Sequence, residues 1–579
     1  MKKNLLLVCF LQLLVLLFFY SDIIIGANKY LMGIEHDGMK NYFMFSYYVK
    51  HFDQLFMHKG FAYPFGEYIF KSDSHPLLAI VFGVLGTMVP FIKNHTVGVL
   101  NFIMILNPII TAGILYKIFY FLKVKSSFAI IASVGIASLS PQFLLLTVGH
   151  YSQVYSFFIP LNILLVLKLF EQKEVKYTNK ILWLILIGFL IHTYIGAMLV
   201  ALNMSILLVQ FFFLKMNRKL LMRFLLANLL PLAVIIILFL FDPIEGRPEF
   251  KINAYHRAAF CNVFLPRYSD FHFLYDWVFD FSFQNKYKWS VKGTYIGLAS
   301  NIFIISFFLL MAVKLFKKQG REFFTKFGEI NFVLLSSGIL VLLYSFGLPT
   351  IVDNGFILGK IPFASQIIAV ERFSYVFYYV ICISSVVFFY RFCNKNKFQK
   401  AFVFGIISLF LFESYAMHAY IDAKIPGRAN VLSEEIFDSY YDFDEWNIDI
   451  SEYDAILPIP IYIRHFLPFT RGGSYSSEEL SMALSVRTGL PLMAVFLSRP
   501  SVNNSQIVLN FVENPKDSSL IETYNNKRIL VVHTNEINNK YEQDLISNLD
   551  TVLFSNGKII VSEIETNSWF KKRKEDIDN

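Results

Sequence analysis

Long apolar segments recur along the chain and dominate its pattern. A helix that crosses the ~30 Å hydrocarbon core of a bilayer needs about 20 predominantly apolar residues. The pattern predicts about eleven such spans, at residues 5–25, 97–122, 127–146, 153–170, 181–199, 200–214, 220–241, 293–315, 329–347, 366–390 and 400–420. A shorter apolar segment at 77–92 predicts a re-entrant or interfacial helix, or a twelfth crossing.

Basic residues between the spans predict the orientation of the chain. With the N-terminus in the cytoplasm, four clusters of Lys and Arg fall on the cytoplasmic side, as the positive-inside rule requires, provided that 77–92 makes no net crossing. These clusters lie at 123–125, 215–223, 314–326 and 391–400. The first apolar run is long for a signal peptide and no Ala-x-Ala cleavage site follows it, so we interpret it as a retained span.

Three long segments then lie on the outer side, as loops at 26–76 and 242–292 and a tail at 421–579. The tail is more polar and contains strand-like runs, with Asn556-Gly557 as a hairpin turn signal. These runs lie at 456–463, 528–533, 551–554 and 558–564, with a helix-compatible segment at 538–549. We therefore predict a polytopic α-helical membrane domain at 1–420 and an extracytoplasmic α/β domain at 421–579, whose residues 571–579 form a charged, disordered end.

Composition narrows the class of protein. The 579 residues are 55% hydrophobic and only 16% charged, whereas soluble domains average roughly 25% charged residues, so a simple soluble enzyme is excluded. The net charge of +9 is explained by the basic residues of the predicted cytoplasmic loops. The positive charge therefore does not indicate a nucleic-acid-binding protein. The four cysteines form no Cys-x-x-Cys pair and predict neither a disulfide framework nor a zinc site.

The first outer loop gathers titratable side chains beside the membrane. They flank an aromatic-rich segment at 42–57, which is compatible with a helix lying on the membrane surface. These side chains are Glu35, His36, Asp37, Glu67, Asp73 and His75. A carboxylate in this place can serve as a general base, since partial burial raises its pKa, or can ligate a divalent cation. An ordinary solvated loop would contain the same residue types, and both interpretations stay open here.

Other polar residues lie at the predicted membrane boundary. Arg372 lies near the outer mouth of the 366–390 span, where an arginine is costly unless it is paired or functional, and its guanidinium suits a phosphate; a snorkelling interfacial arginine is the alternative. His150 and Gln153 lie between two spans and could bind sugar hydroxyls or a phosphate, or form a turn. We interpret His192, inside an apolar run, as a packing residue.

The architecture and three short motifs resemble the GT-C superfamily of integral membrane glycosyltransferases. The motifs are His36-Asp37-Gly38 after the first span, Ser140-Pro141 followed by Gly149-His150-Tyr151-Ser152-Gln153, and Pro362 followed by Glu371-Arg372-Phe373. The resemblance covers roughly residues 1–420 and implies polyprenyl-phosphate-linked sugar donors. It also implies an outer-loop acid as catalytic base or acceptor-positioning residue, which falls here on Asp37. A strict Asp-x-Asp is absent, so the need for a divalent cation stays open.

These observations predict a glycosyltransferase of the plasma (inner) membrane that moves a sugar from a polyprenyl-phosphate donor to a lipid, glycan or protein acceptor at the outer face. Asp37 is the predicted catalytic residue. The predicted substrate-binding residues are Glu35, His36, Glu67, Asp73, His75, His150, Gln153 and Arg372. A transporter or flippase, a polymerase of lipid-linked glycans, and a non-catalytic assembly protein are the alternatives. The transporter is disfavoured because the chain shows no related halves and its polar residues cluster at the outer boundary.

Overall fold

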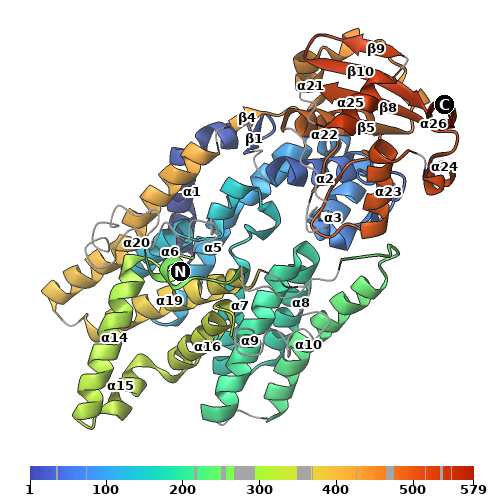
Figure 1. The fold of residues 1–579 in the computed structure, drawn as a ribbon. Coiled ribbons are helices and arrows are strands. Elements are labelled where there is room, and N and C mark those ends of the chain that lie inside the picture. Colours follow the sequence, from blue (N-terminus) through green and yellow to red (C-terminus); the bar gives the residue numbers. More distant parts are fainter. Residues whose placement is uncertain are drawn as a thin grey trace. The chain divides into compact units, whose positions relative to one another are not determined.

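The computed structural model describes most of the chain. The described residues are 1–33, 37–72, 75–213, 218–248, 256–265, 294–348, 367, 369–394, 396–425, 427–464, 475–515, 517–534, 539–549 and 551–578. The chain forms two compact units, each built from stretches that are distant in sequence (Figure 1). Unit 1 comprises 1–25, 102–237 and 250–426, and unit 2 comprises 26–101, 238–249 and 427–579.

Unit 1 is a bundle of apolar helices, and it makes this chain an integral membrane protein of the predicted polytopic type. Its longer helices are α1 (Lys2–Ile25), α5 (Thr96–Phe121), α6 (Ser126–Ser138), α7 (Phe158–Gln172), α8 (Val175–Ile191), α9 (Thr193–Phe213), α10 (Arg218–Leu240), α14 (Leu298–Phe316), α16 (Glu329–Ser345), α19 (Ser374–Phe392) and α20 (Lys397–Lys424). Among the described residues, nine helices are long and apolar enough to cross a bilayer. A tenth candidate is α15 (Gly320–Phe327) with α16, a pair bent by 87°.

The predicted spans at 181–199 and 200–214 have wrong boundaries. The structure ends α8 at Ile191 and begins α9 at Thr193, because His192 between them is extended, with φ −159° and ψ 131°. The apolar pattern runs through this break without interruption, so hydropathy could not locate it. With 17 residues, α8 is shorter than the roughly 20 residues of a typical span. It is therefore one of the eleven or so predicted spans that is missing from the nine or ten candidates among the described residues.

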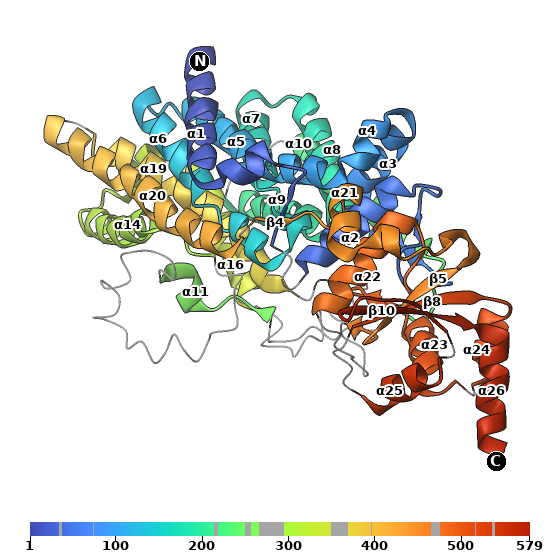
Figure 2. The ribbon, with the colours of Figure 1, turned by 90° about the horizontal axis from the view of Figure 1, so that it is seen from above.

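The helices of unit 1 divide into central and peripheral ones. Of the residues in the most apolar stretch of each helix, 94% are buried inside the protein in Val370–Phe392, which contains α19, whereas 22% are buried in α14. The central helix α19 packs against α14, α15 and α16 and also contacts α6, α7, α9 and α20 (Figure 2). Peripheral helices expose large side chains such as Phe316 (91%) and Phe211 (75%). Exposed apolar surface on this scale indicates that lipid covers the outside of the bundle.

The short apolar segment at 77–92 does not form a full span. It folds as α3 (Pro76–Met88) and α4 (Pro90–Asn94), which are separated at Val89. A helix of 13 residues is about 20 Å long, which is too short to cross a ~30 Å core. Both helices belong to unit 2, where they pack against α2 (Gly38–Lys50).

The tail folds as the predicted α/β domain. Its sheet has the strand order β5-β8-β10-β9, from β5 (Ala455–Ile459), β8 (Arg528–Thr534), β10 (Ile559–Glu565) and β9 (Val552–Ser555). β5 runs parallel to β8, and the other neighbours are antiparallel. The turn at Asn556-Gly557 joins β9 to β10, with Gly557 at φ +79°, a conformation that glycine adopts without strain. The prediction that residues 571–579 are disordered is wrong for 571–578, because these residues belong to α26 (Thr566–Asp578).

Among its described residues, unit 2 has five further α-helices and three strand pairs. The helices are α21 (Glu434–Tyr441), α22 (Tyr475–Thr488), α23 (Val502–Glu513), α24 (Ser518–Tyr524) and α25 (Lys540–Ser547). The strand pairs are β1 (Tyr30–Met32) with β4 (Gly427–Ala429), β2 (Met57–His58) with β3 (Glu67–Tyr68), and β6 (Ile463–Arg464) with β7 (Val495–Phe496). The pair β1–β4 therefore links the loop at 26–76 to the tail.

The aromatic segment after the first span is not a surface helix. The structure forms α2 over Gly38–Lys50 and buries every residue from Gly38 to Val49. The helix packs between α3 and α22, so protein and not membrane covers its faces. A surface helix was expected because the sequence shows an aromatic, mildly amphipathic stretch, but one of the two helices that cover it, α22, comes from the tail, more than 400 residues further along the chain.

His58 is a fully buried histidine at the centre of unit 2. Its Nε2–H donates to the Met44 carbonyl at 2.8 Å, and its Nδ1 accepts the Gly60 N–H at 3.0 Å. The ring stacks against Tyr47, with centroids 5.5 Å apart. Both nitrogens are therefore used by the neutral ring, and a second proton would break the Gly60 hydrogen bond. Burial accordingly lowers the pKa of His58 to about 4.

Acidification should destabilise unit 2 through His58. Between about pH 6.5 and 4 the unfolded chain binds a proton that the folded ring refuses, so stability falls as the pH falls, by about 2 kcal/mol at about pH 5. Hydrogen exchange of the peptides around 38–68 at pH 7.5 and 5 measures this. His58→Gln should abolish most of the pH dependence, whereas the control His95→Gln, near the surface, should keep it. An unchanged pH dependence in His58→Gln would contradict the assignment.

Candidate functional site

A polar cluster around Arg372 is the main candidate site in unit 1. Arg372 lies in the short 3-10 turn Val370–Phe373 that leads into α19, and its side chain is only 7% exposed. Its Nη2 lies 3.1 Å from His150 Nδ1, and its Cζ lies 4.4 Å above the ring of Tyr194. Arginine only donates, so His150 Nδ1 is the acceptor, and the ring is neutral with its proton on Nε2.

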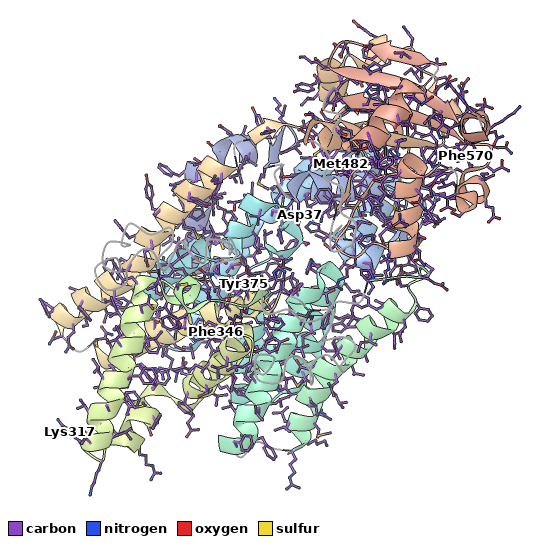
Figure 3. All side chains as sticks on the ribbon, in the orientation of Figure 1. Asp37, Lys317, Phe346, Tyr375, Met482 and Phe570 are labelled. Carbon is purple, nitrogen blue, oxygen red and sulfur yellow. The ribbon has the colours of Figure 1, made fainter. Side chains whose placement is uncertain are left out.

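Arg372 forms no ion pair with the described residues, although the buried side chain of Glu371 is adjacent to it in sequence. No carboxylate of that part of the chain forms an ion pair with the guanidinium, and the Nε–H of Arg372 has no hydrogen-bond partner there. The hydroxyl of Tyr375, one turn further along α19 and labelled in Figure 3, is buried and equally without a partner in the described chain. Buried charges are normally paired, so this cluster has the character of an anion site.

Three breaks in helical structure bring the cluster together. His150 follows Gly149, which turns the chain at φ +71° between the 3-10 segments Phe143–Val148 and Tyr151–Gln153. Tyr194 lies in the first turn of α9, where its hydroxyl accepts the Ala369 N–H at 2.7 Å. The third break precedes α19 itself. Because helix ends carry unpaired backbone groups, such breaks are places where side chains and ligands meet.

His192 and Gln153 extend the cluster. His192 Nδ1 accepts the Tyr194 N–H at 3.2 Å, and its Nε2 lies 3.3 Å from the amide nitrogen Nε2 of Gln153. The His192 ring also stacks on Tyr194, with centroids 5.6 Å apart. His192 is therefore part of the polar cluster, where the sequence predicted a packing residue. Tyr194 and Tyr375 were missed, because tyrosines are too common in this chain to stand out.

Asp37 is the predicted catalytic residue, and it lies in unit 2 beside Lys40. It precedes the first residue of α2, and its side chain makes no capping hydrogen bond (Figure 3). Lys40, one turn further on, places its Nζ 3.2 Å from Asp37 Oδ1 and 5.2 Å from the ring centroid of Phe496. Lys40 is fully buried, whereas the Asp37 side chain is 20% exposed. The ammonium favours the ionised carboxylate, which is the form that a general base needs.

Glu67 belongs to a buried ion-pair network. Its Oε1 and Oε2 accept from Arg247 at 2.5 and 3.0 Å, and Oε1 also accepts the Tyr68 N–H. Arg247 uses its remaining donors on Asp242 and on the Arg499 carbonyl, so all five N–H groups are bonded. Burial raises the pKa of Glu67, and Arg247 offsets part of the rise. The arrangement gives Glu67 a structural task, and its predicted contact with substrate stays a prediction.

Removing Arg247 should destabilise unit 2 by about 3–5 kcal/mol, since Arg247→Ala leaves two carboxylates buried without their cation. Hydrogen exchange over 57–68 and 238–248 measures the loss. The control Arg528→Ala removes two surface ion pairs, with Glu452 and Glu563, on a side chain that is 39% exposed, and should cost under about 1 kcal/mol. Equal stability of Arg247→Ala and the unmodified protein would contradict the structural task. A Glu67→Gln variant of normal stability but weakened transfer would support the substrate contact.

The other predicted residues are placed as follows. His75 is fully buried at the start of α3, with φ +53°. Glu35, His36 and Asp73 lie outside the described residues, as does most of the outer loop at 242–292. In the described chain no group of three or more His, Cys, Asp or Glu residues could hold a metal ion. Arg372, His150 and Gln153 come together in unit 1, whereas Asp37 belongs to unit 2.

Comparison with known proteins identifies the family. Residues 8–412 match a family described as a domain of unknown function, DUF6311. The chain belongs to the DUF6311 family. The match includes all of the Arg372 cluster and the start of α2, and it ends within α20. No curated protein matches the sequence of this DUF6311 protein.

Solved structures show the fold. The apo oligosaccharyltransferase of Archaeoglobus fulgidus is similar with a TM-score of 0.50 at 11% identity, over 91% of this chain and 69% of that one. ArnT from Cupriavidus metallidurans (0.46, 10%, 95% and 97%) and the arabinofuranosyltransferase AftD from Mycobacteria (0.47, 13%, 93% and 35%) are further similar structures. The likeness to the oligosaccharyltransferase confirms that this DUF6311 protein has a GT-C fold. At this identity it shows the fold alone.

Proposed function

We propose that this DUF6311 protein is a membrane glycosyltransferase that takes a sugar from a polyprenyl-phosphate donor and transfers it to a lipid, glycan or protein acceptor at the outer face of the plasma (inner) membrane. The observation that carries the proposal is the buried guanidinium of Arg372, which forms no ion pair with any of the described residues. The fold supports the same class of reaction, but fold alone does not define chemistry.

A donor phosphate would complete the Arg372 cluster. A buried cation without a partner costs several kcal/mol, and an anionic ligand recovers this cost when it binds. The flat guanidinium can donate two parallel hydrogen bonds to phosphate oxygens. Tyr194 fixes the plane of the guanidinium by stacking, and neutral His150 leaves the full positive charge for the ligand. These groups would also stabilise the phosphate as it leaves the sugar.

Asp37 supplies the second requirement, a base for the acceptor hydroxyl. As the acceptor oxygen bonds to the sugar carbon and the bond to the phosphate oxygen breaks, the hydroxyl proton passes to the carboxylate. Lys40 forms an ion pair with Asp37 at 3.2 Å before the acceptor arrives. The partial exposure of Asp37 leaves it accessible, whereas Lys40 is completely enclosed.

The location of the cluster supports a site at the outer face. Figure 3 shows Lys317, in the basic segment after α14, at one edge of unit 1, and Tyr375 well away from that edge. If that basic segment is cytoplasmic, as the positive-inside rule predicts, the Arg372 cluster lies away from the cytoplasmic boundary. Reporter fusions after residues 93 and 421 test this orientation, and a cytoplasmic reporter after 421 would contradict it.

Lipid analysis tests the function itself. Membranes from cells with and without the protein are extracted, and prenyl-phosphate sugars are measured by mass spectrometry. We expect one prenyl-phosphate hexose or pentose to accumulate in the absence of the protein, and to return to its normal level when the unmodified chain is restored but not when Arg372→Ala is. Identical prenyl-linked sugars in all membranes would contradict the proposal.

A further inference from the structure

A small pocket lies at the C-terminal end of α2, wholly within unit 2 and within the described residues. Its volume is about 260 Å³, and it is lined by Tyr47, Tyr48, His51, Asp53, Lys59 and Gly489, among others. This volume is slightly below the ~300 Å³ at which small-molecule sites usually begin. The pocket therefore has room for one small ring and not for a larger ligand.

The aromatic wall of the pocket is rigid. The hydroxyl of Tyr47 donates to the Gly489 carbonyl at 2.9 Å, and the hydroxyl of Tyr48 bonds the Leu55 carbonyl at 2.8 Å. Both rings also stack against buried His58. The two side chains are 5% and 4% exposed, so they present a small apolar area to the pocket, and this area is held without loss of side-chain entropy on binding.

His51 contributes a fixed hydrogen-bond acceptor. Its Nε2–H donates to the Val486 carbonyl at 2.8 Å, which leaves Nδ1 with the free lone pair, and burial lowers the pKa of His51, so that the ring stays neutral. Gly489 has φ +83°, and a Cβ there would lie 3.1 Å from His51 Nδ1. Glycine therefore keeps the approach to Nδ1 open.

Asp53 and Lys59 form an ion pair at the edge of the pocket. Their side chains are 47% and 50% exposed. An exposed pair of this kind is worth little, so both groups can turn to a ligand at small cost, the carboxylate as acceptor and the ammonium as donor. The pair is electrically balanced, which gives no preference for an anion. His51 Nδ1 and the Asp53–Lys59 pair together offer acceptors and donors without a net charge. Such a set of groups beside aromatic rings suits a polyhydroxylated ring.

We propose that this pocket binds one sugar residue of an extended glycan acceptor. The identity of the glycan as acceptor rests on the proposed function. Asp37 precedes α2, and His51 follows its last residue, so the pocket lies roughly 20 Å along the helix from Asp37, at 1.5 Å per residue. Only a glycan of several residues spans that distance. The protein therefore prefers long acceptors to single sugars.

Binding to an array of defined oligosaccharides, from one to six residues, tests the pocket. The probe is the full chain in lipid nanodiscs, and no donor is needed. We expect the unmodified protein to bind a subset of the longer glycans, and the double variant Asp53→Ala/Lys59→Ala to bind the same glycans at least tenfold more weakly. The control Glu174→Ala/Lys176→Ala removes a similarly exposed pair in unit 1 and should bind normally. Equal binding by the pocket variant, or no binding by the unmodified protein, overturns the proposal.

The two proposals fail in different ways. If the pocket variant loses glycan binding while no prenyl-linked sugar accumulates in cells that lack the protein, the result supports the sugar-binding pocket and contradicts the transfer proposal. If transfer is demonstrated and the pocket variant serves long and short acceptors at the normal ratio of kcat/KM values, the transfer proposal stands and the pocket falls.

Discussion

Replacing Arg372 by alanine should lower glycosyl transfer in membrane vesicles by at least about 100-fold. A charge-assisted hydrogen bond contributes about 1.5–3 kcal/mol, and loss of one electrostatic group that stabilises a transition state costs about 10²–10³ in rate. The effect falls at the upper part of this range because Arg372 is buried and forms no competing ion pair in the described chain. Initial rates against donor concentration measure both the higher donor requirement and the lower maximal rate.

The stability of the same variant separates a functional arginine from a structural one. Since a buried unpaired charge is unfavourable, Arg372→Ala should unfold at the same temperature as the unmodified protein or higher. Arg391 at the other end of α19 is the matched control, because it donates to the Phe327 carbonyl at 2.7 Å and holds a helix end. Arg391→Ala should lose stability and keep normal donor saturation. Normal transfer by Arg372→Ala would show that Arg372 merely lies at the membrane boundary.

Asp37→Asn should lower the single-turnover rate of transfer by about 10³-fold, within the 10²–10⁴ that general-base catalysis contributes. The amide keeps the size and polarity of the side chain but cannot take a proton. Because the Asp37 side chain does not cap α2, the helix should remain intact. Rapid-quench measurement with preloaded donor gives the rate, and hydrogen exchange over 38–50 verifies the helix.

Two companion variants define the role of Asp37. Asp449→Asn, at the start of another short helical turn in unit 2, should transfer normally. Lys40→Met removes the cation 3.2 Å from Asp37 and should lower the transfer rate less than Asp37→Asn does, because the carboxylate itself remains. A transfer rate of Asp37→Asn above one-tenth of normal would exclude the carboxylate as the base.

The sequence by itself determined the features that depend on local pattern. The length of an apolar run decides whether a helix can cross a bilayer, and this information is present in each segment separately. The alternation of strand residues and the Asn556-Gly557 turn predicted β9, β10 and the α/β tail for the same reason. Arg372, His150 and Gln153 stood out because charged or amide side chains are costly beside apolar spans.

Only the tertiary structure decided which of these residues meet. Arg372 and His150 are 222 positions apart, and Arg247 and Glu67 are 180 apart, and no periodicity records such contacts. The break at His192 was missed because a continuous apolar run looks the same whether or not a helix ends within it. The burial of α2 was missed because α22, which packs on it, lies far away in the sequence. Long-range packing makes Glu67 a partner of Arg247 and leaves Arg372 without an ion pair in the described chain, and that difference in electrostatic surroundings separates a structural charge from one available to a substrate.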